Sequence, residues 1–213
     1  MIFGNRVPYE YFATSGKGES DAGSEGLKFE TGSYDAALSD AGIENVNVIS
    51  YTSVIPTIAK KISKEEGLKR IRWGEVMECI KAQANGKKGK FISAAVITID
   101  VFNSSKKYLG GFALEYSGSG NREDALKSLG KSLKGLIERR KYGEIKGEIE
   151  FFKDNITSNG MIIHPGKIFV YDSMKVKEEH GTVIASLCWV SYKFPNSKTS
   201  GHNSKKTRKK RKL

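Results

Sequence analysis

The run FISAAVITIDV, at residues 91–101, most constrains what this chain can fold into. Nearly all of its residues are apolar or small. Such a run is typical of a strand that is buried on both faces at the centre of a sheet. With 213 residues the chain is long enough to form one domain with a substantial core around that strand.

Two helices are predicted beside the sheet. Residues 122–142 have leucines at helical spacing on one face and Lys and Arg on the other. A shorter helix is predicted at 33–41, where Ser33 suits the N-cap and Gly42 suits the position after the C-terminal end.

Further strands are expected before and after the central run. Residues 15–32 are rich in Gly, Ser and acidic residues and are expected to form a loop. The order of elements lacks regular βαβ alternation, so we predict an α+β fold with mainly antiparallel sheets. The expected strands are 45–54 (interrupted at 52–53), 75–83, 91–101, 110–116, 147–153, 167–172 and 182–192.

The positive charge is concentrated at the C-terminal end. The formal net charge is +12, and Lys and Arg between residues 205 and 212 supply seven positive charges without one acidic residue among them. Residues 196–213 hold almost nothing that a core could bury, so a disordered tail is expected after a domain of residues 1–195. The tail is either a site of weak attraction to nucleic acid or another polyanion, or a solvated end without a role.

Composition disfavours several other classes of protein. No apolar run approaches the ~20 residues that span a bilayer, and the N-terminus lacks the apolar stretch of a secretory signal, so a cytoplasmic protein is expected. Cys79 and Cys188 are too few for a disulfide framework and are expected to be buried free thiols. The three histidines have no metal-ligand spacing, so no metal site is predicted.

Two blocks of sequence carry the residues of chemical interest. The first, YDAALSDAGIENVNVISYTSVIP at 34–56, ends in a Thr-Ser pair within an apolar, β-branched run. The second, LGGFALEYSGSG at 109–120, places Glu115 beside apolar residues such as Phe112 and Leu114, which could raise its pKa. A serine can attack the preceding carbonyl only in a preorganised backbone with an oxyanion donor, so a Thr-Ser pair alone is ordinary structure.

Both blocks resemble segments of the pyruvoyl-dependent arginine decarboxylases. The resemblance covers about residues 5–192, except 144–166, which we interpret as an insertion. It implies a four-layer αββα sandwich and subunits that form trimers or hexamers, with active sites between neighbours. It also implies a covalent pyruvoyl cofactor in place of pyridoxal phosphate.

The resemblance further implies that the chain cuts its own backbone between Thr52 and Ser53. The products are a β chain, residues 1–52, and an α chain, residues 53–213, that begins with the pyruvoyl group made from Ser53. Asn47 assists the cleavage and contacts the substrate, according to the same resemblance.

The remaining site residues follow from the resemblance as well. Glu115 matches the residue that donates a proton to the substrate α-carbon. Asp35 matches the carboxylate that faces the substrate side chain, and Leu38 lies one helical turn later at the pocket wall. A carboxylate pairs well with a guanidinium, which favours arginine as substrate and agmatine and carbon dioxide as products. Lysine and histidine stay open as substrates, and so does an uncleaved, non-catalytic homologue that binds nucleic acid or a protein partner through its tail.

Overall fold

The computed structural model describes residues 6–21 and 29–194. The helices are α1 (Phe29–Ala41), α2 (Lys64–Leu68) and α3 (Arg122–Arg139). The strands are β1 (Val7–Pro8), β2 (Glu10–Ser20), β3 (Asn47–Ser50), β4 (Val54–Ile55), β5 (Lys60–Lys61), β6 (Val76–Lys87), β7 (Phe91–Asn103), β8 (Tyr108–Gly118), β9 (Ile156–Ser158), β10 (Met161–Lys175), β11 (His180–Trp189) and β12 (Tyr192–Lys193). None of the helices in these residues is both long and apolar enough to cross a membrane.

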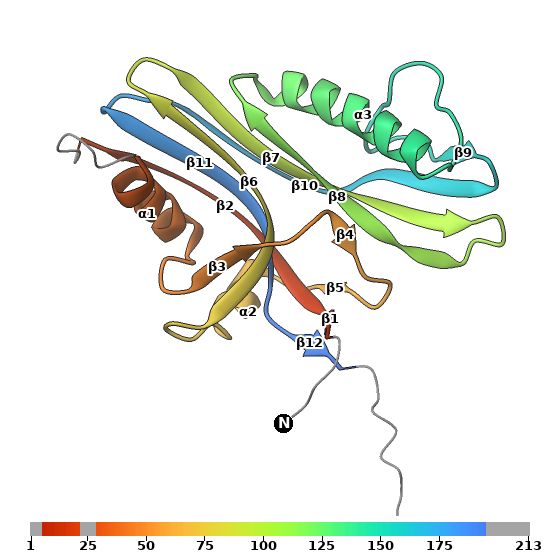
Figure 1. The fold of residues 1–213 in the computed structure, drawn as a ribbon, viewed down its shortest axis with the longest axis horizontal. Helices are drawn as coiled ribbons and strands as arrows, with labels where there is room; N and C mark the ends of the chain where they lie inside the picture. The colour runs from red at the N-terminus through yellow and green to blue at the C-terminus, as the bar shows by residue number, and fades with distance from the viewer. Residues whose placement is uncertain (1–5, 22–28, 195–213) are drawn as a thin grey trace, which may run out of the picture.

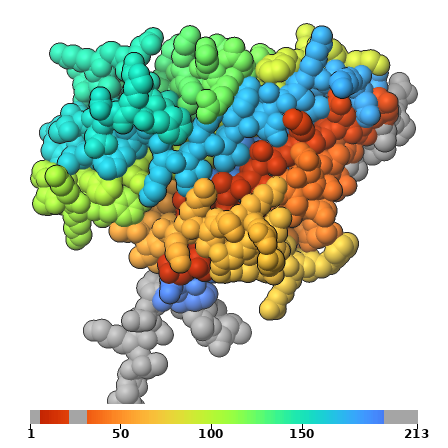
Figure 2. Space-filling model, turned by 180° about the vertical axis from the view of Figure 1, so that it is seen from behind, coloured from red at the N-terminus to blue at the C-terminus, as the bar shows by residue number. Residues whose placement is uncertain are grey.

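Two five-stranded sheets pack face to face, and a helix covers the outer face of each (Figure 1). The sheet under α1, here called the α1 sheet, has the order β3-β6-β11-β2-β5. The sheet under α3, here called the α3 sheet, has the order β4-β8-β7-β10-β9. Most neighbours are antiparallel, while β3–β6 and β2–β5 are parallel. Strand β2 pairs with β11. On the face shown in Figure 2, the red strand β2 also lies beside β10, which runs from teal to blue.

Three apolar clusters fill the three spaces between the four layers. One lies between α1 and its sheet, one between the two sheets, and one between α3 and its sheet. Representative members, from α1 across to α3, are Leu38 and Ile184, then Val96 and Leu187, then Ile97 and Leu133. The predicted four-layer αββα sandwich is therefore confirmed.

The strongest local signals of the sequence correspond to the best-buried elements. The run 91–101 lies in β7, between β8 and β10, and is buried from residue 92 to residue 101. Helix α3 begins as predicted, because the Asn121 side chain accepts the backbone N–H groups of Glu123 and Asp124. It ends at Arg139, three residues earlier than predicted. Cys79 and Cys188 are buried free thiols, as predicted.

Three predictions of local structure are wrong. Ser33 does not cap the first helix, because α1 begins at Phe29 and Ser33 lies inside it. The expected loop at 15–32 contains the second half of β2 and the start of α1, with only residues 22–28 outside the described part. The expected strand at 147–153 is irregular chain, and β9 follows it. Its residues Ile149 and Phe151 pack against the apolar cluster under α3 without joining a ladder. The tail at 196–213 lies outside the described residues, so its disorder stays a prediction.

Glycines in β2 explain the error at 15–32. A Cβ on Gly16 would lie 2.6 Å from the backbone nitrogen of Ala41 and would overlap the backbone of Ala37. A Cβ on Gly18 would meet the same helix. These glycines let α1 approach the sheet closely, and they do not mark a loop.

We predict opposite effects of two Gly→Ala changes. Gly16→Ala should lower the free energy of unfolding by about 1–3 kcal/mol, because its methyl group meets backbone atoms of α1. Gly130→Ala in α3 should raise it by about 0.5–1 kcal/mol, because the nearest atom lies 3.6 Å away and alanine favours a helix. Urea unfolding measures both, and a harmless Gly16→Ala would contradict the close packing of α1.

Candidate active site

The predicted cleavage pair lies where the chain crosses from one sheet to the other. Strand β3 belongs to the α1 sheet and β4 to the α3 sheet, and only residues 51–53 separate them. The Tyr51 N–H donates to the Cys79 carbonyl at 2.7 Å, and the Ala113 N–H donates to the Ser53 carbonyl at 2.8 Å. The peptide bond before Ser53 therefore lies between two residues that are each tied to a different sheet.

Ser53 and Glu115 lie on adjacent strands of the α3 sheet. The register of β4 with β8, together with the hydrogen bond just described, sets Ser53 opposite Ala113. Glu115 is two residues further along β8 and points to the same side as Ala113, because side chains alternate along a strand. That side faces the space between the sheets, since Ala113 and Val96, the cross-strand partner of Glu115, belong to the inter-sheet cluster. Diagonal positions of such a ladder are about 7–8 Å apart, so one substrate can reach both residues.

The environment of Glu115 favours a proton donor. Burial raises the pKa of its carboxyl, although part of the side chain stays exposed. The apolar neighbours in sequence do not provide that burial, because Phe112 and Leu114 point the other way, toward α3. A raised pKa keeps a carboxyl protonated closer to neutral pH, as general acid catalysis requires.

One chain does not bring Asn47 to the cleavage bond. Asn47 is the first residue of β3, where its N–H donates to the Glu75 carbonyl at 2.8 Å and its side-chain amide donates to the Gly74 carbonyl at 2.9 Å. The extended strand from Asn47 to Ser50 alone spans about 10 Å, at ~3.3 Å per residue. Ser53 lies three residues further on, and neither of these hydrogen bonds of Asn47 reaches it, so the role of Asn47 stays a prediction.

The predicted substrate-binding residues lie on the far side of the α1 sheet. Asp35 is exposed on α1, which covers the outer face of that sheet. Leu38 is only 8% exposed and packs into the cluster under α1. The sheet therefore separates both residues from Ser53 and Glu115 within one chain (Figure 1). Their roles stay predictions.

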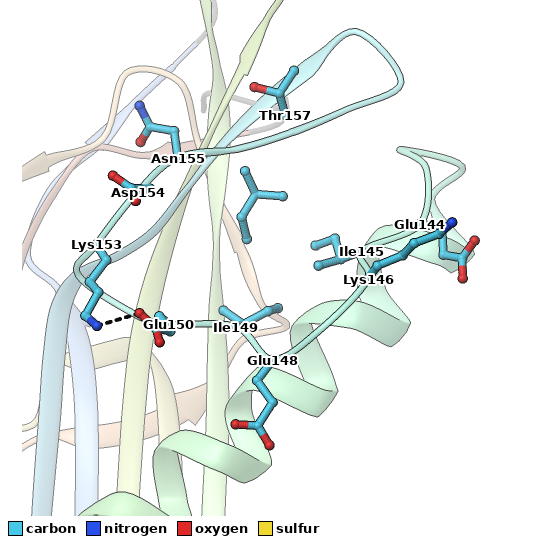
Figure 3. A pocket seen from close by; sticks show the side chains of 11 residues that line it. Glu144, Ile145, Lys146, Glu148, Ile149, Glu150, Lys153, Asp154, Asn155 and Thr157 are labelled. Atoms are coloured by element: carbon cyan, nitrogen blue, oxygen red, sulfur yellow. Dashed lines mark ion pairs between the residues drawn. The ribbon is translucent and has the colours of Figure 1, made fainter.

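The cavity shown in Figure 3 is a separate feature. It has a volume of about 330 Å³ and is formed by residues 144–157 beside α3. Its lining mixes charges and includes an ion pair between Lys153 and Glu150. None of the predicted site residues lines it. In the described part of the chain, no group of three or more His, Cys, Asp or Glu side chains could hold a metal ion.

Comparison with known proteins assigns the chain to a family. The model of the pyruvoyl-dependent arginine decarboxylase family matches residues 10–194. The chain belongs to this family. Membership implies a pyruvoyl cofactor, and the crossing between the sheets fits one, because Ser53 has its carbonyl fixed there and a carboxyl of raised pKa lies on the next strand.

Individual relatives within the family are moderately similar. A pyruvoyl-dependent arginine decarboxylase of Thermoplasma volcanium is 28% identical over 181 residues, which are 84% of this chain and 94% of that protein. One from Chlamydia caviae is 34% identical over 121 residues, 54% of this chain and 62% of the relative. One from Archaeoglobus fulgidus is 33% identical over 113 residues, which are 53% of this chain and 66% of the relative. The match thus spans less than two thirds of the chlamydial relative.

Sequence reasoning missed one unusual residue of this family member. Glu78 on β6 is a buried carboxylate at the end of the inter-sheet space. The available signal was its position between Met77 and Cys79, because a charged residue inside an apolar strand is rarely buried without a partner. No motif marks it.

We predict that Glu115→Gln slows decarboxylation by about 10²–10⁴-fold, the usual worth of a general acid. Since burial raises the pKa of Glu115, the protonated donor is present below that pKa and is lost as pH rises through it. The kcat of the wild type should therefore fall on the alkaline side, and the variant should lose this dependence. Carbon dioxide release across pH tests both, with exposed Glu123→Gln as control; wild-type turnover in Glu115→Gln would remove this residue from the reaction.

Proposed function

We propose that this chain is a self-processing decarboxylase that converts L-arginine to agmatine and carbon dioxide. The observation that carries the proposal is the position of Ser53 in the crossing between the sheets, with Glu115 on the adjacent strand and the same face. Family membership and the relatives named as arginine decarboxylases support the choice of reaction. Asp35 supports the choice of a cationic substrate side chain.

Maturation begins at the peptide bond between Thr52 and Ser53. The Ser53 hydroxyl attacks the Thr52 carbonyl carbon, and the backbone amide becomes an ester. Loss of the proton from the Ser53 α-carbon then breaks the ester Cβ–O bond and releases the Thr52 carboxylate. Water replaces the remaining nitrogen as ammonia and leaves a pyruvoyl group at position 53. The hydrogen bonds of Tyr51 and Ser53 to different sheets support this site, because they limit the conformations of the bond that must react.

Decarboxylation then uses the same location. A pyruvoyl carbonyl supplies the electron sink that the loss of carbon dioxide from an α-amino acid requires. Glu115 delivers a proton to the α-carbon after carbon dioxide has left. Glu115 lies on the inter-sheet face of β8, where burial raises the pKa of its carboxyl although part of the side chain stays exposed.

A neighbouring copy of the chain supplies Asn47, Asp35 and Leu38 in this proposal, within a homotrimer or hexamer. Strand β3 is the edge of its sheet, and an uncovered edge is a natural contact between chains. Apolar side chains near Asn47 are also exposed: Ile49 and Val76 are each 49% exposed and Trp73 is 85% exposed. Burial of such a patch against another copy is favourable.

We predict that Ser53→Ala abolishes both cleavage and decarboxylation, because alanine offers no nucleophile. Intact mass should show one full-length chain for this variant and two fragments, cut at 52/53, for the wild type. Ser50→Ala, at the exposed end of β3, is the matched control and should be cut normally. Normal fragments from Ser53→Ala would exclude the mechanism, and an intact wild type would favour a non-catalytic homologue.

We predict that Asp35→Asn lowers arginine kcat/KM by the equivalent of about 2–5 kcal/mol while leaving cleavage normal, because the amide keeps the shape and removes the charge. Asp40→Asn, an exposed neighbour on α1 that accepts a hydrogen bond from the Lys17 backbone, is the control. Labelled carbon dioxide release from arginine, lysine, ornithine and histidine measures the effect. If arginine kcat/KM does not change, another residue reads the side chain.

A further inference from the structure

Glu78 is a carboxylate in an apolar place. It lies on β6, with 6% of its surface exposed. Its neighbours Met77 and Cys79 face α1, whereas Ile80 faces the other sheet. Since side chains alternate along a strand, Glu78 points into the space between the sheets, as Ile80 does. A buried carboxylate is costly unless it is paired, so its partners indicate what it does.

The carboxylate joins segments from both ends of the chain. Its Oε1 forms an ion pair with the guanidinium of Arg6, just before β1. That guanidinium also lies 4.8 Å from the ring centre of Tyr192 on β12. The second oxygen, Oε2, and the Tyr192 hydroxyl are buried without a hydrogen-bond partner among the described residues. Burial raises the pKa of Tyr51 and Tyr192, and although Oε2 has no partner by strict geometry, both hydroxyls lie close enough to Glu78 for its carboxylate to raise the pKa further.

Tyr51 is the residue that connects Glu78 to the crossing. Ile49 on β3 pairs with Glu78, and Tyr51, two residues later, lies on the same side. The Tyr51 ring packs against the inter-sheet cluster, and its N–H is held by the Cys79 carbonyl. Two effects raise the pKa of Tyr51 to about 12: burial is the larger, and the nearby Glu78 carboxylate is the second. The hydroxyl thus stays protonated and can donate to the carboxylate.

We propose that Glu78 is a positioning residue for self-cleavage: paired with Arg6 and lying beside Tyr51, it holds the upstream side of the Thr52–Ser53 bond in place. The inference rests on the proposed function and adds a residue to it. The Ala113 N–H holds the downstream side through the Ser53 carbonyl. With both sides held, the Ser53 hydroxyl stays close to the carbonyl that it attacks, and a shift of about 1 Å can cost 10²-fold in rate.

The test follows cleavage of the full-length chain during cell-free synthesis. Glu78→Gln keeps the size of the side chain and removes its charge, and it should slow formation of the two fragments by about 10–100-fold. Glu78→Asp should recover part of the cleavage rate. The cleavage rate of Tyr51→Phe should lie between those of Glu78→Gln and the wild type. Once cut, the Glu78→Gln enzyme should have wild-type kcat/KM per cleaved chain, because Glu78 acts before the substrate binds.

Two controls separate positioning from ordinary stabilisation. Glu10→Gln removes another carboxylate–arginine pair of the α1 sheet, 2.8 Å from Arg70, and should be cut at the wild-type rate. Glu78→Gln combined with Ser53→Ala cannot be cut, so its Tm, compared with that of Ser53→Ala alone, reports folding only. Equal Tm values with slow cleavage support the proposal.

Two results would overturn it. One is a wild-type cleavage rate in Glu78→Gln. The other is a lower Tm in Glu78→Gln combined with Ser53→Ala than in Ser53→Ala alone, large enough to explain the slower cleavage, together with no recovery of the cleavage rate in Glu78→Asp. A wild-type chain that stays intact is a different failure, because it removes the proposed function itself and the inference with it.

Discussion

The apolar packing between the two sheets is the constraint on which the rest of the molecule depends. Ile80 and Leu187 of one sheet and Val96 and Ala113 of the other are all buried in it. Between β3 and β4 the chain passes from one sheet to the other, and this crossing is only three residues long. A connection this short has little freedom of its own, so the packing of the sheets determines its conformation. The proposed cleavage bond therefore lies in a connection whose conformation depends on how the two sheets pack.

The same layering explains which candidate residues meet. Ser53 and Glu115 belong to neighbouring strands, so one chain brings them together. Asp35 lies on a helix behind the other sheet, and Asn47 lies at the far end of an edge strand. In the proposed function, bond breaking uses residues that one chain brings together, and substrate recognition uses residues of a neighbouring copy. Assembly of copies would then decide when substrate can bind.

The elements that the sequence predicted best are those that can be recognised without knowing which elements pack against them. The run at 91–101 is apolar on both faces, and α3 carries a continuous stripe and a capping box, so each is evident without knowledge of its partner. Strand β2 could not be recognised, because Gly16 and Gly18 are required by the approach of a helix that the sequence does not show. Ile149 alternates with charged residues as in a strand, yet it packs as irregular chain.

The candidate site was predictable to the extent that it is local. Ser53 and Glu115 stand in continuous blocks of sequence, and the structure places these two candidates on adjacent strands, while their roles stay predictions. Glu78 could not be found this way, because the role proposed for it rests on contacts with residues 72 positions before it and more than 100 positions after it. Long-range contacts of this kind exist only after the sheets have formed.

The path of the chain has a consequence for how a cut protein would unfold. A break after Thr52 would leave β1, β2, α1 and β3 on one polypeptide and every other element on a second. Strand β2 lies between β5 and β11, so the shorter polypeptide would contribute an inner strand to the α1 sheet and would pair with strands of the longer one on both sides. The uncut chain can unfold and refold as one molecule. The cut one would separate into two species on unfolding, and its apparent stability would then depend on protein concentration.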